Sequence, residues 1–212
     1  MNIRTLVICG DSWHPAETIV RGLSPLANAG FDFEFLDDGA NWTINKLDQF
    51  FVIVLAKANM ISATDDGAWL TPDLDAAFQN HLRLGGGLLV IHGGTSRYDK
   101  LPLMRHATGG AFVSHPPQCA VTLEPKRSHQ LSRGLEALTV RDEHYFMTFE
   151  GSEADVFLHS RSEHGIQPAG WTRSEGLGRV CVLTPGHNLE VWLHPEFQKL
   201  LSNALYWTAK LN

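Results

Sequence analysis

The stretch Gly85-Gly86-Gly87-Leu88-Leu89-Val90-Ile91-His92-Gly93-Gly94 decides the fold of this chain. Its apolar run, without polar alternation, is typical of a strand buried on both faces of a parallel sheet. Glycines flank the run, and an imidazole stands at its end. Ligands of open parallel sheets bind beyond the carboxyl ends of the strands. The sequence therefore predicts that His92 lies at the rim of a binding site.

Similar runs recur on both sides of this stretch. Thr5–Cys9, Phe51–Ala56 and Val180–Leu183 are short and continuously apolar, which predicts further buried strands. Phe31–Leu36 alternates phenylalanine with acidic residues, which predicts a half-buried strand. Strands separated by helical segments favour a parallel arrangement.

Helical patterns fill the gaps between these runs. One helix is expected from Pro15, a second from the N-cap Thr71 followed by Pro72, and a last one from His194-Pro195. The alternation predicts an α/β fold with a doubly wound, mainly parallel sheet and helices on both faces. The segment 95–141 is less regular and is interpreted as an addition, with one strand at Ala120–Glu124. We expect a single domain over residues 1–212.

Composition narrows the class of protein. The chain has 212 residues, 43% hydrophobic and 19% charged, with a net charge of −6 and no basic block, which argues against a nucleic-acid surface. The apolar runs are too short to cross a membrane. The first residues lead directly into a strand and lack a signal-peptide pattern, so a cytoplasmic location is expected. Three widely spaced cysteines argue against a disulfide framework.

Two further strand ends have the arrangement of His92. His14 follows the first run in the segment Gly10-Asp11-Ser12-Trp13-His14, and His187 follows the last run after Pro185-Gly186. Parallel strands end at the same rim, so His14, His92 and His187 are expected to meet. Imidazole acts as acid, base or metal ligand near neutral pH. The three histidines are candidate catalytic residues.

Neighbours of these histidines are candidate substrate-binding residues. Asp11 and Trp13 lie in the first strand-to-helix turn, where Asp11 has the alternative role of a helix cap. Gly93 and Gly94 are expected to let ligand or backbone approach closely. An aromatic ring such as that of Trp13 offers a ligand an apolar face with a polar edge.

The segment Asp142-Glu143-His144-Tyr145 gathers four polar or amphipathic side chains. In an extended backbone, alternation puts Glu143 and Tyr145 on one face and Asp142 and His144 on the other. The four therefore cannot all face one site. Glu143 is a candidate base or ligand. Tyr145 and His144 are candidate substrate-binding residues, and Tyr145, like Trp13, is a candidate for stacking on a substrate ring.

A divalent metal, zinc or manganese, is one expectation for this site. His14, His92 and His187 are the candidate ligands, coming from separate loops, because no local HxxxH or HxH spacing is present. The alternative uses the same histidines, without a metal, as general acid and base on a polar substrate.

A nucleophile is hard to identify. Cys9 and Cys181 fall within predicted strands and are interpreted as small core residues. The chain has no G-x-S-x-G motif. The hydroxyls of Thr95 and Ser96, after Gly94, remain an alternative.

Several segments together resemble the ThuA-like (trehalose-utilisation) proteins in order and spacing. They are the stretch ending at His92-Gly93-Gly94, Gly109-Gly110-Ala111-Phe112-Val113-Ser114-His115-Pro116, Ser128-His129 with Gly134-Leu135, Asp142-Glu143-His144-Tyr145, and Trp171-Thr172-Arg173 through Pro185-Gly186-His187. The family usually has a Gly-His pair in its first loop. This chain has Gly10-Asp11 there, so either His14 takes that place or the function has changed.

The resemblance implies a flavodoxin-like fold similar to class I glutamine amidotransferases. Those enzymes carry a cysteine nucleophile where this chain has His92, which argues against glutamine hydrolysis. The resemblance also implies an enzyme of sugar catabolism, for a trehalose-type or oxidised disaccharide. A non-catalytic sugar-binding or regulatory module and a residual hydrolase or amidotransferase remain alternatives. The expected partner is a small carbohydrate, and association into a homo-oligomer is a further expectation.

Overall fold

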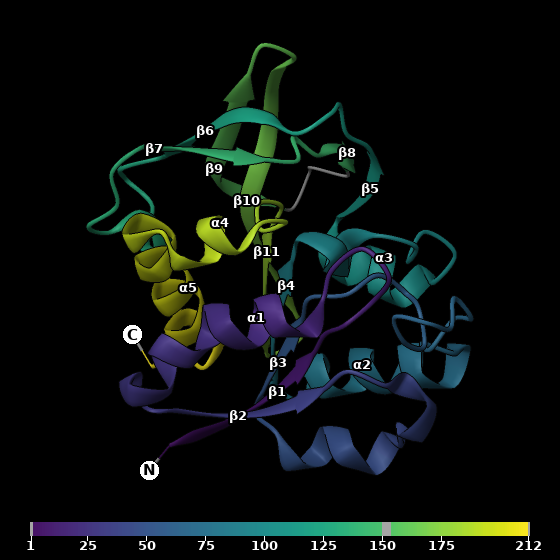
Figure 1. Cartoon of the computed structure of the whole chain (residues 1–212). Helices are drawn as coiled ribbons and strands as arrows, with labels where there is room; N and C mark the ends of the chain where they lie inside the picture. The colour runs from purple at the N-terminus through teal and green to yellow at the C-terminus, as the bar shows by residue number, and fades with distance from the viewer. Residues whose placement is uncertain (1, 150–153, 212) are drawn as a thin grey trace.

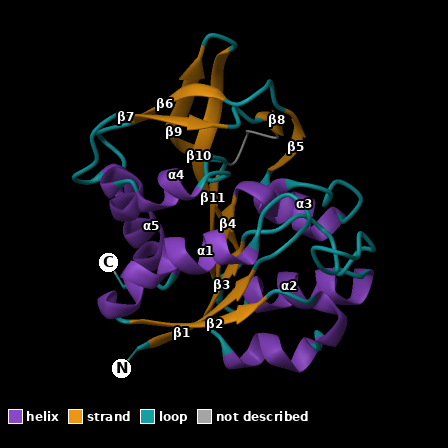
Figure 2. Ribbon diagram, viewed as in Figure 1, coloured by secondary structure: helices purple, strands orange, loops and turns teal. Residues whose placement is uncertain are grey.

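A nine-stranded sheet forms the centre of the computed structural model, which describes residues 2–149 and 154–211 (Figures 1 and 2). Its strands follow the order β2-β1-β3-β4-β11-β10-β9-β6-β7. The first five pair in parallel. They are β2 (Phe31–Leu36), β1 (Ile3–Ile8), β3 (Val52–Leu55), β4 (Gly87–Ile91) and β11 (Gly178–Leu183). The predicted parallel strands are confirmed, with bounds that differ by one or two residues.

The other half of the sheet is antiparallel. It consists of β10 (Gly165–Glu175), β9 (Asp155–Ser162), β6 (Cys119–Pro125) and β7 (Leu138–Asp142). A separate pair joins β5 (Gly110–Ser114) to β8 (Phe146–Phe149). The less regular segment predicted over 95–141 contains β5, β6 and the start of β7, and β8, β9 and β10 follow it. β10 escapes prediction because Pro168 and Gly170, which normally weaken strands, lie where its register with β9 shifts.

The helices begin where local signals place them. They are α1 (Ala16–Leu23), α2 (Pro72–Arg83), α3 (Pro102–Thr108), α4 (Leu189–Leu193) and α5 (Pro195–Thr208). The Thr71 side chain accepts a hydrogen bond from the backbone N–H of Leu74, which confirms the predicted N-cap. Nδ1 of His194 likewise accepts the N–H of Glu196 and caps α5.

Helices lie on both faces of the parallel strands. Side chains alternate along each strand between two cores: Val7 and Val54 pack with residues of α1 and α5, whereas Leu6 and Ile53 pack with residues of α2 and α3. Burying one such side chain fully contributes about 1.5–3 kcal/mol. These two cores confirm the doubly wound α/β fold, and they explain why its strands are continuously apolar.

The strand order positions the histidine-bearing loops. β1, β4 and β11 run in the same direction, with only β3 between β1 and β4, so the loops that follow them emerge at one edge of the sheet.

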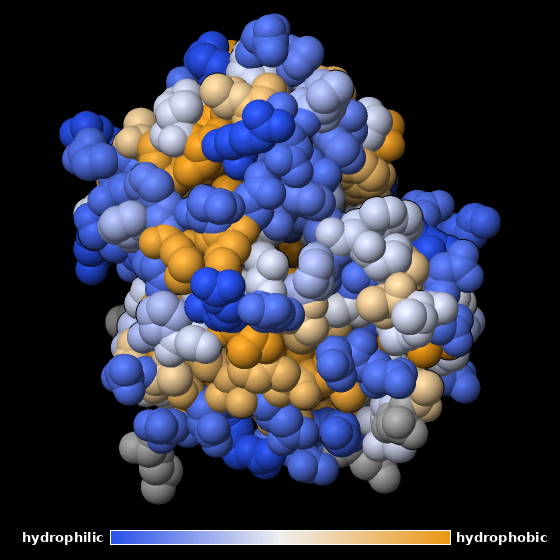
Figure 3. All heavy atoms as spheres, viewed as in Figure 1, coloured by the Kyte–Doolittle hydropathy of each residue, from blue (hydrophilic) through white to orange (hydrophobic). Residues whose placement is uncertain are grey.

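On the face seen in Figure 3, hydrophilic residues cover much of the part over the antiparallel strands, and apolar residues gather lower, around α1.

Candidate metal centre

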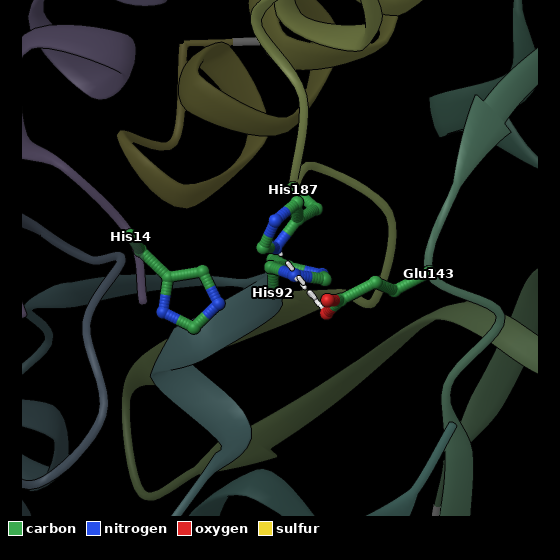
Figure 4. A group of neighbouring side chains, drawn as sticks. All are labelled: His14, His92, Glu143 and His187. Atoms are coloured by element: carbon green, nitrogen blue, oxygen red, sulfur yellow. Dashed lines mark ion pairs between the residues drawn. The ribbon is translucent and has the colours of Figure 1, made fainter. Parts of the chain in front are cut away.

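Four side chains from separate loops converge beyond the carboxyl ends of the parallel strands (Figure 4). His14, His92, His187 and Glu143 each offer one ligand atom, and these atoms all lie within 4.8 Å of one another. Ring centroids of the three histidines are 4.9 to 5.5 Å apart. The convergence of the strand-end histidines, expected from sequence, is therefore present.

His92 occupies a tight turn directly after β4. Its φ of 46° lies in the left-handed region, which is uncommon for a residue with a side chain. Its Nδ1 lies 2.7 Å from the carbonyl oxygen of Thr184, which can only accept, so the ring proton resides on Nδ1. Nε2 is buried, has no hydrogen-bond partner among the described residues, and faces the cluster.

Asp11 orients His14. Its carboxylate oxygens lie 3.0 and 2.8 Å from Nδ1 of His14, and they also accept the N–H groups of Trp13, His14 and Ala58. A carboxylate only accepts, so it fixes the His14 proton on Nδ1 and leaves Nε2 free for a ligand. Burial would raise the pKa of Asp11, but His14 and the backbone donors outweigh it and lower this pKa. Burial lowers the pKa of His14, although Asp11 opposes the shift.

Asp142 holds the loop that carries His187. Its buried carboxylate accepts the backbone N–H groups of Gly186 (2.8 Å) and His187 (3.0 Å). Nδ1 of His187 is buried without a hydrogen-bond partner among the described residues, although Oε2 of Glu143 lies 3.3 Å away. The contact with Glu143 raises the pKa of His187.

Glu143 reaches the centre from the loop after β7. Its Oε2 lies 3.3 Å from Nε2 of His92 as well as from Nδ1 of His187, and its Oε1 lies 3.5 Å from Nε2 of His115. Burial would raise the pKa of Glu143, but His187 and His92 outweigh it and hold this pKa well below its usual range. The carboxylate is therefore ionised at neutral pH.

The donor set fits a divalent cation. The carboxylate carries the negative charge, and the imidazoles contribute nitrogen donors that suit zinc and related ions. The buried, unpartnered Nε2 of His92 and Nδ1 of His187 are polar atoms that a structure normally satisfies, and a cation between them would do so. A metal-binding histidine usually donates the proton of its other ring nitrogen to a protein acceptor. His14 and His92 do so with Nδ1, which leaves Nε2 for a metal.

Three predicted substrate contacts have other roles. Both Asp11 oxygens are occupied by protein donors, so Asp11 supports His14 and has no oxygen left for a substrate. Gly93 and Gly94 are buried, and their neighbours explain the missing side chains. A Cβ on Gly93 would lie 2.6 Å from Nδ1 of His14, and one on Gly94 would collide with the carbonyl oxygen of Leu55. The two glycines admit protein groups where a ligand was expected.

His144 points away from the centre, as alternation along its segment predicts. Its Nδ1 lies 2.7 Å from the hydroxyl of Ser162, and its Nε2 lies 3.0 Å from the hydroxyl of Ser160, so both nitrogens are engaged on β9. The structure therefore places both ring nitrogens of His144 on β9, outside the cluster. Asp142 faces the loop after β11 instead, while Glu143 and Tyr145 line one cavity.

A cavity of about 540 Å³ opens over the cluster. Trp13 stands at its rim with 53% of its surface exposed, and Tyr145 is buried. The sequence reasoning missed the lining residues Ser12, Phe112 and His115. His115 follows no parallel strand, and only its place in a family segment could have drawn attention to it.

Within residues 2–149 and 154–211, no serine or threonine hydroxyl forms a hydrogen bond to a ring nitrogen of His14, His92 or His187. The Thr95 hydroxyl donates to the carbonyl oxygen of His92, and among the described residues neither Thr95 nor Ser96 forms a hydrogen bond to an imidazole nitrogen. Cys9 and Cys181 are buried, and burial raises the pKa of each thiol, to about 12 for Cys9. The hydrolase alternative therefore lacks the contact it requires.

Known proteins share the sequence pattern and the fold of this chain. A family model described as trehalose utilisation, ThuA, matches residues 5–208. The chain belongs to the ThuA family. None of the functionally curated proteins compared with it matches significantly.

Solved structures share the ThuA fold. A ThuA-like protein from Parabacteroides merdae has a TM-score of 0.80 at 19% identity, covering 99% of this chain and 90% of its own. A cytoplasmic protein from Salmonella typhimurium has a TM-score of 0.71 at 16% identity, covering 96% and 98%. A β-galactosidase from Rahnella sp. has a TM-score of 0.65 at 11% identity, covering 100% of this chain but 32% of its own. Within the described part of this ThuA protein, every helix is too short or too polar to span a bilayer.

Proposed function

We propose that this ThuA protein is a divalent-metal-dependent enzyme of carbohydrate catabolism. His14, His92 and His187 would hold the ion, with zinc as the first choice because the donors are imidazoles. The observation that carries this proposal is the convergence of the four ligand atoms, two of which are buried and have no hydrogen-bond partner among the described residues. A bound divalent cation supplies Lewis-acid polarisation of a substrate oxygen.

Glu143 is proposed as the base. Its carboxylate is ionised, lies beside the three histidines, and lines the cavity into which a substrate would enter. A base must reach the proton that it accepts. Oε2 of Glu143 lies beside His92 and His187, whereas Oε1 lies beside His115. Asp11 orients His14, and Asp142 holds the loop that carries His187.

A sugar is the proposed substrate class. Trp13 presents an exposed indole at the cavity rim, and a sugar ring can pack its apolar face on such a surface. Among the described residues that line the cavity there is no Lys or Arg, so the site suits a neutral sugar better than a phosphorylated one. The family description supports the same class.

The Salmonella relative, described as cytoplasmic, supports a cytoplasmic location.

Metal analysis tests the centre. The stripped protein is titrated with zinc and, separately, manganese, and stoichiometry and affinity are measured by calorimetry. The wild type should bind one zinc ion, and His92→Asn should lose it; asparagine is chosen because it tolerates the left-handed backbone of residue 92. His159→Asn, at an exposed histidine of β9, is the matched control and should bind normally. Failure of the wild type to bind either ion would refute the metal centre.

Glu143→Gln tests the role of the carboxylate. If Glu143 is the base, this variant keeps its metal and loses turnover. Loss of the metal together with turnover would make Glu143 a fourth ligand instead.

A substrate screen tests the enzyme assignment. The zinc-loaded protein is incubated with unmodified and 3-keto disaccharides, and products are followed by chromatography. Turnover should disappear on chelation. Binding of sugar without any turnover would favour a sugar-binding module, and Trp13→Ala should then weaken that binding.

A further inference from the structure

The ring of Tyr145 is enclosed by other rings. The His92 ring stacks on it at 4.1 Å, Phe112 lies at 4.3 Å and His115 at 5.9 Å, and only 3% of Tyr145 is exposed. A ring so enclosed has no open face to offer a sugar. Stacking on Tyr145, one of the expectations from sequence, is therefore excluded by its neighbours.

The hydroxyl of Tyr145 is different from those of the other two tyrosines. Tyr98 accepts the indole N–H of Trp69 and donates to the carbonyl oxygen of Lys57. Tyr206 donates to the carbonyl oxygen of Ala29. Within residues 2–149 and 154–211, the Tyr145 hydroxyl forms no hydrogen bond. Tyr145 lines the cavity, and its hydroxyl has no partner among the described residues, so this hydroxyl is available for a ligand.

The surroundings of Tyr145 indicate what that partner is. Tyr145 lines the same cavity as His14, Glu143 and His187, and its ring is in direct contact with His92. No Lys or Arg belongs to the described lining of this cavity. The phenol O–H of Tyr145 can donate a hydrogen bond, and the Glu143 carboxylate in the same cavity can accept one. A ligand that places one acceptor oxygen and one donor in the cavity would satisfy both.

We propose that the Tyr145 hydroxyl donates a hydrogen bond to a carbonyl-type or anionic oxygen of the ligand held at the His14–His92–His187 centre. This inference rests on the proposed metal function. It makes Tyr145 a catalytic residue that favours substrates carrying a carbonyl oxygen, or developing negative charge on oxygen, over fully reduced polyols.

Tyr145→Phe is a selective test because phenylalanine keeps the ring that packs on His92 and Phe112. Acetohydroxamate, a small chelator with an anionic oxygen, serves as the probe, and its binding to the zinc-loaded protein is measured by calorimetry. Hydrogen bonds to charged groups are strong, so Tyr145→Phe should weaken acetohydroxamate binding by roughly 10- to 100-fold. Zinc affinity should stay as in the wild type. Tyr206→Phe is the matched control, remote from the cavity lining, and should bind acetohydroxamate normally.

The outcomes separate this proposal from the one it rests on. Normal zinc binding with acetohydroxamate affinity within twofold of the wild type in Tyr145→Phe would overturn the role of Tyr145 and leave the metal centre intact. Loss of zinc in Tyr145→Phe would show a structural role and also overturn it. Zinc binding without any acetohydroxamate binding in the wild type would contradict an accessible ligand position. A wild type that binds no zinc would overturn both proposals.

Discussion

Both carboxylate oxygens of Asp11 lie within hydrogen-bonding distance of Nδ1 of His14, at 3.0 and 2.8 Å. Asp11 is itself held by three backbone N–H groups, so the pair is rigid on the side away from the cavity. This contact fixes the tautomer of His14. It also connects the loop after β1 to the proposed metal centre.

Asp11→Asn should weaken zinc binding by roughly 10- to 100-fold, the usual cost of losing a partner that orients a metal-binding histidine. The amide can donate to Nδ1 as well as accept, so the tautomer of His14 is no longer fixed. Competition with a chromophoric chelator measures the affinity. Asp32→Asn, on the exposed side of β2, is the control. Equal zinc affinities in both variants would contradict the positioning role of Asp11.

Alanine at Gly93 and at Gly94 should have different effects. A methyl group on Gly93 meets the His14 side chain and no backbone atom, so Gly93→Ala should fold but displace His14 from Asp11 and lose zinc affinity. A methyl group on Gly94 meets the backbone carbonyl of Leu55, which cannot move without disturbing β3. Gly94→Ala should therefore lower stability by about 1–3 kcal/mol. Urea denaturation and zinc titration of the two variants distinguish these effects, and identical behaviour would refute this explanation.

Tyr98→Phe should destabilise the protein by about 1–3 kcal/mol, because it leaves the buried indole N–H of Trp69 and the carbonyl oxygen of Lys57 without a partner. The half-buried Tyr206 makes one hydrogen bond, to Ala29, so Tyr206→Phe should cost less. Free energies of unfolding from urea denaturation provide the comparison. A larger loss in Tyr206→Phe would contradict the assigned importance of the Tyr98 contacts.

His81 should contribute to loss of stability in acid. Burial lowers its pKa, with Asp48 opposing the shift, and its Nε2 is buried without a hydrogen-bond partner among the described residues. The unfolded chain then takes up the proton first, so this contribution is complete above about pH 6.5 and is lost as pH falls through the lower folded pKa.

His81→Gln should therefore flatten the decline in unfolding free energy between pH 7 and pH 5, measured by urea denaturation with a chelator present. Part of the decline should remain, because burial also lowers the pKa values of His14, His129 and His144. His159→Gln, at an exposed position, should leave it unchanged. An unaltered slope in His81→Gln would rule out this contribution.

The parallel half of the fold could be predicted because its signals are local. A strand buried on both faces, such as β4, needs a continuous apolar run, and an N-cap such as Thr71 is determined by its own turn. The strand-end positions of His14, His92 and His187 followed from the same patterns, since parallel strands share a rim. The antiparallel half was harder to predict because Pro168 and Gly170 interrupt the pattern of β10.

The sequence by itself thus determined the doubly wound sheet and the rim where the histidines gather. Only the tertiary structure decided which neighbours reach that rim. His115 and Glu143 arrive on loops of the antiparallel region, and the side chains of Asp11 and His144 are engaged by protein partners. Periodicity assigns a residue to a face of its own strand. Contacts between loops depend on how the whole sheet pairs and twists, and no local pattern encodes this.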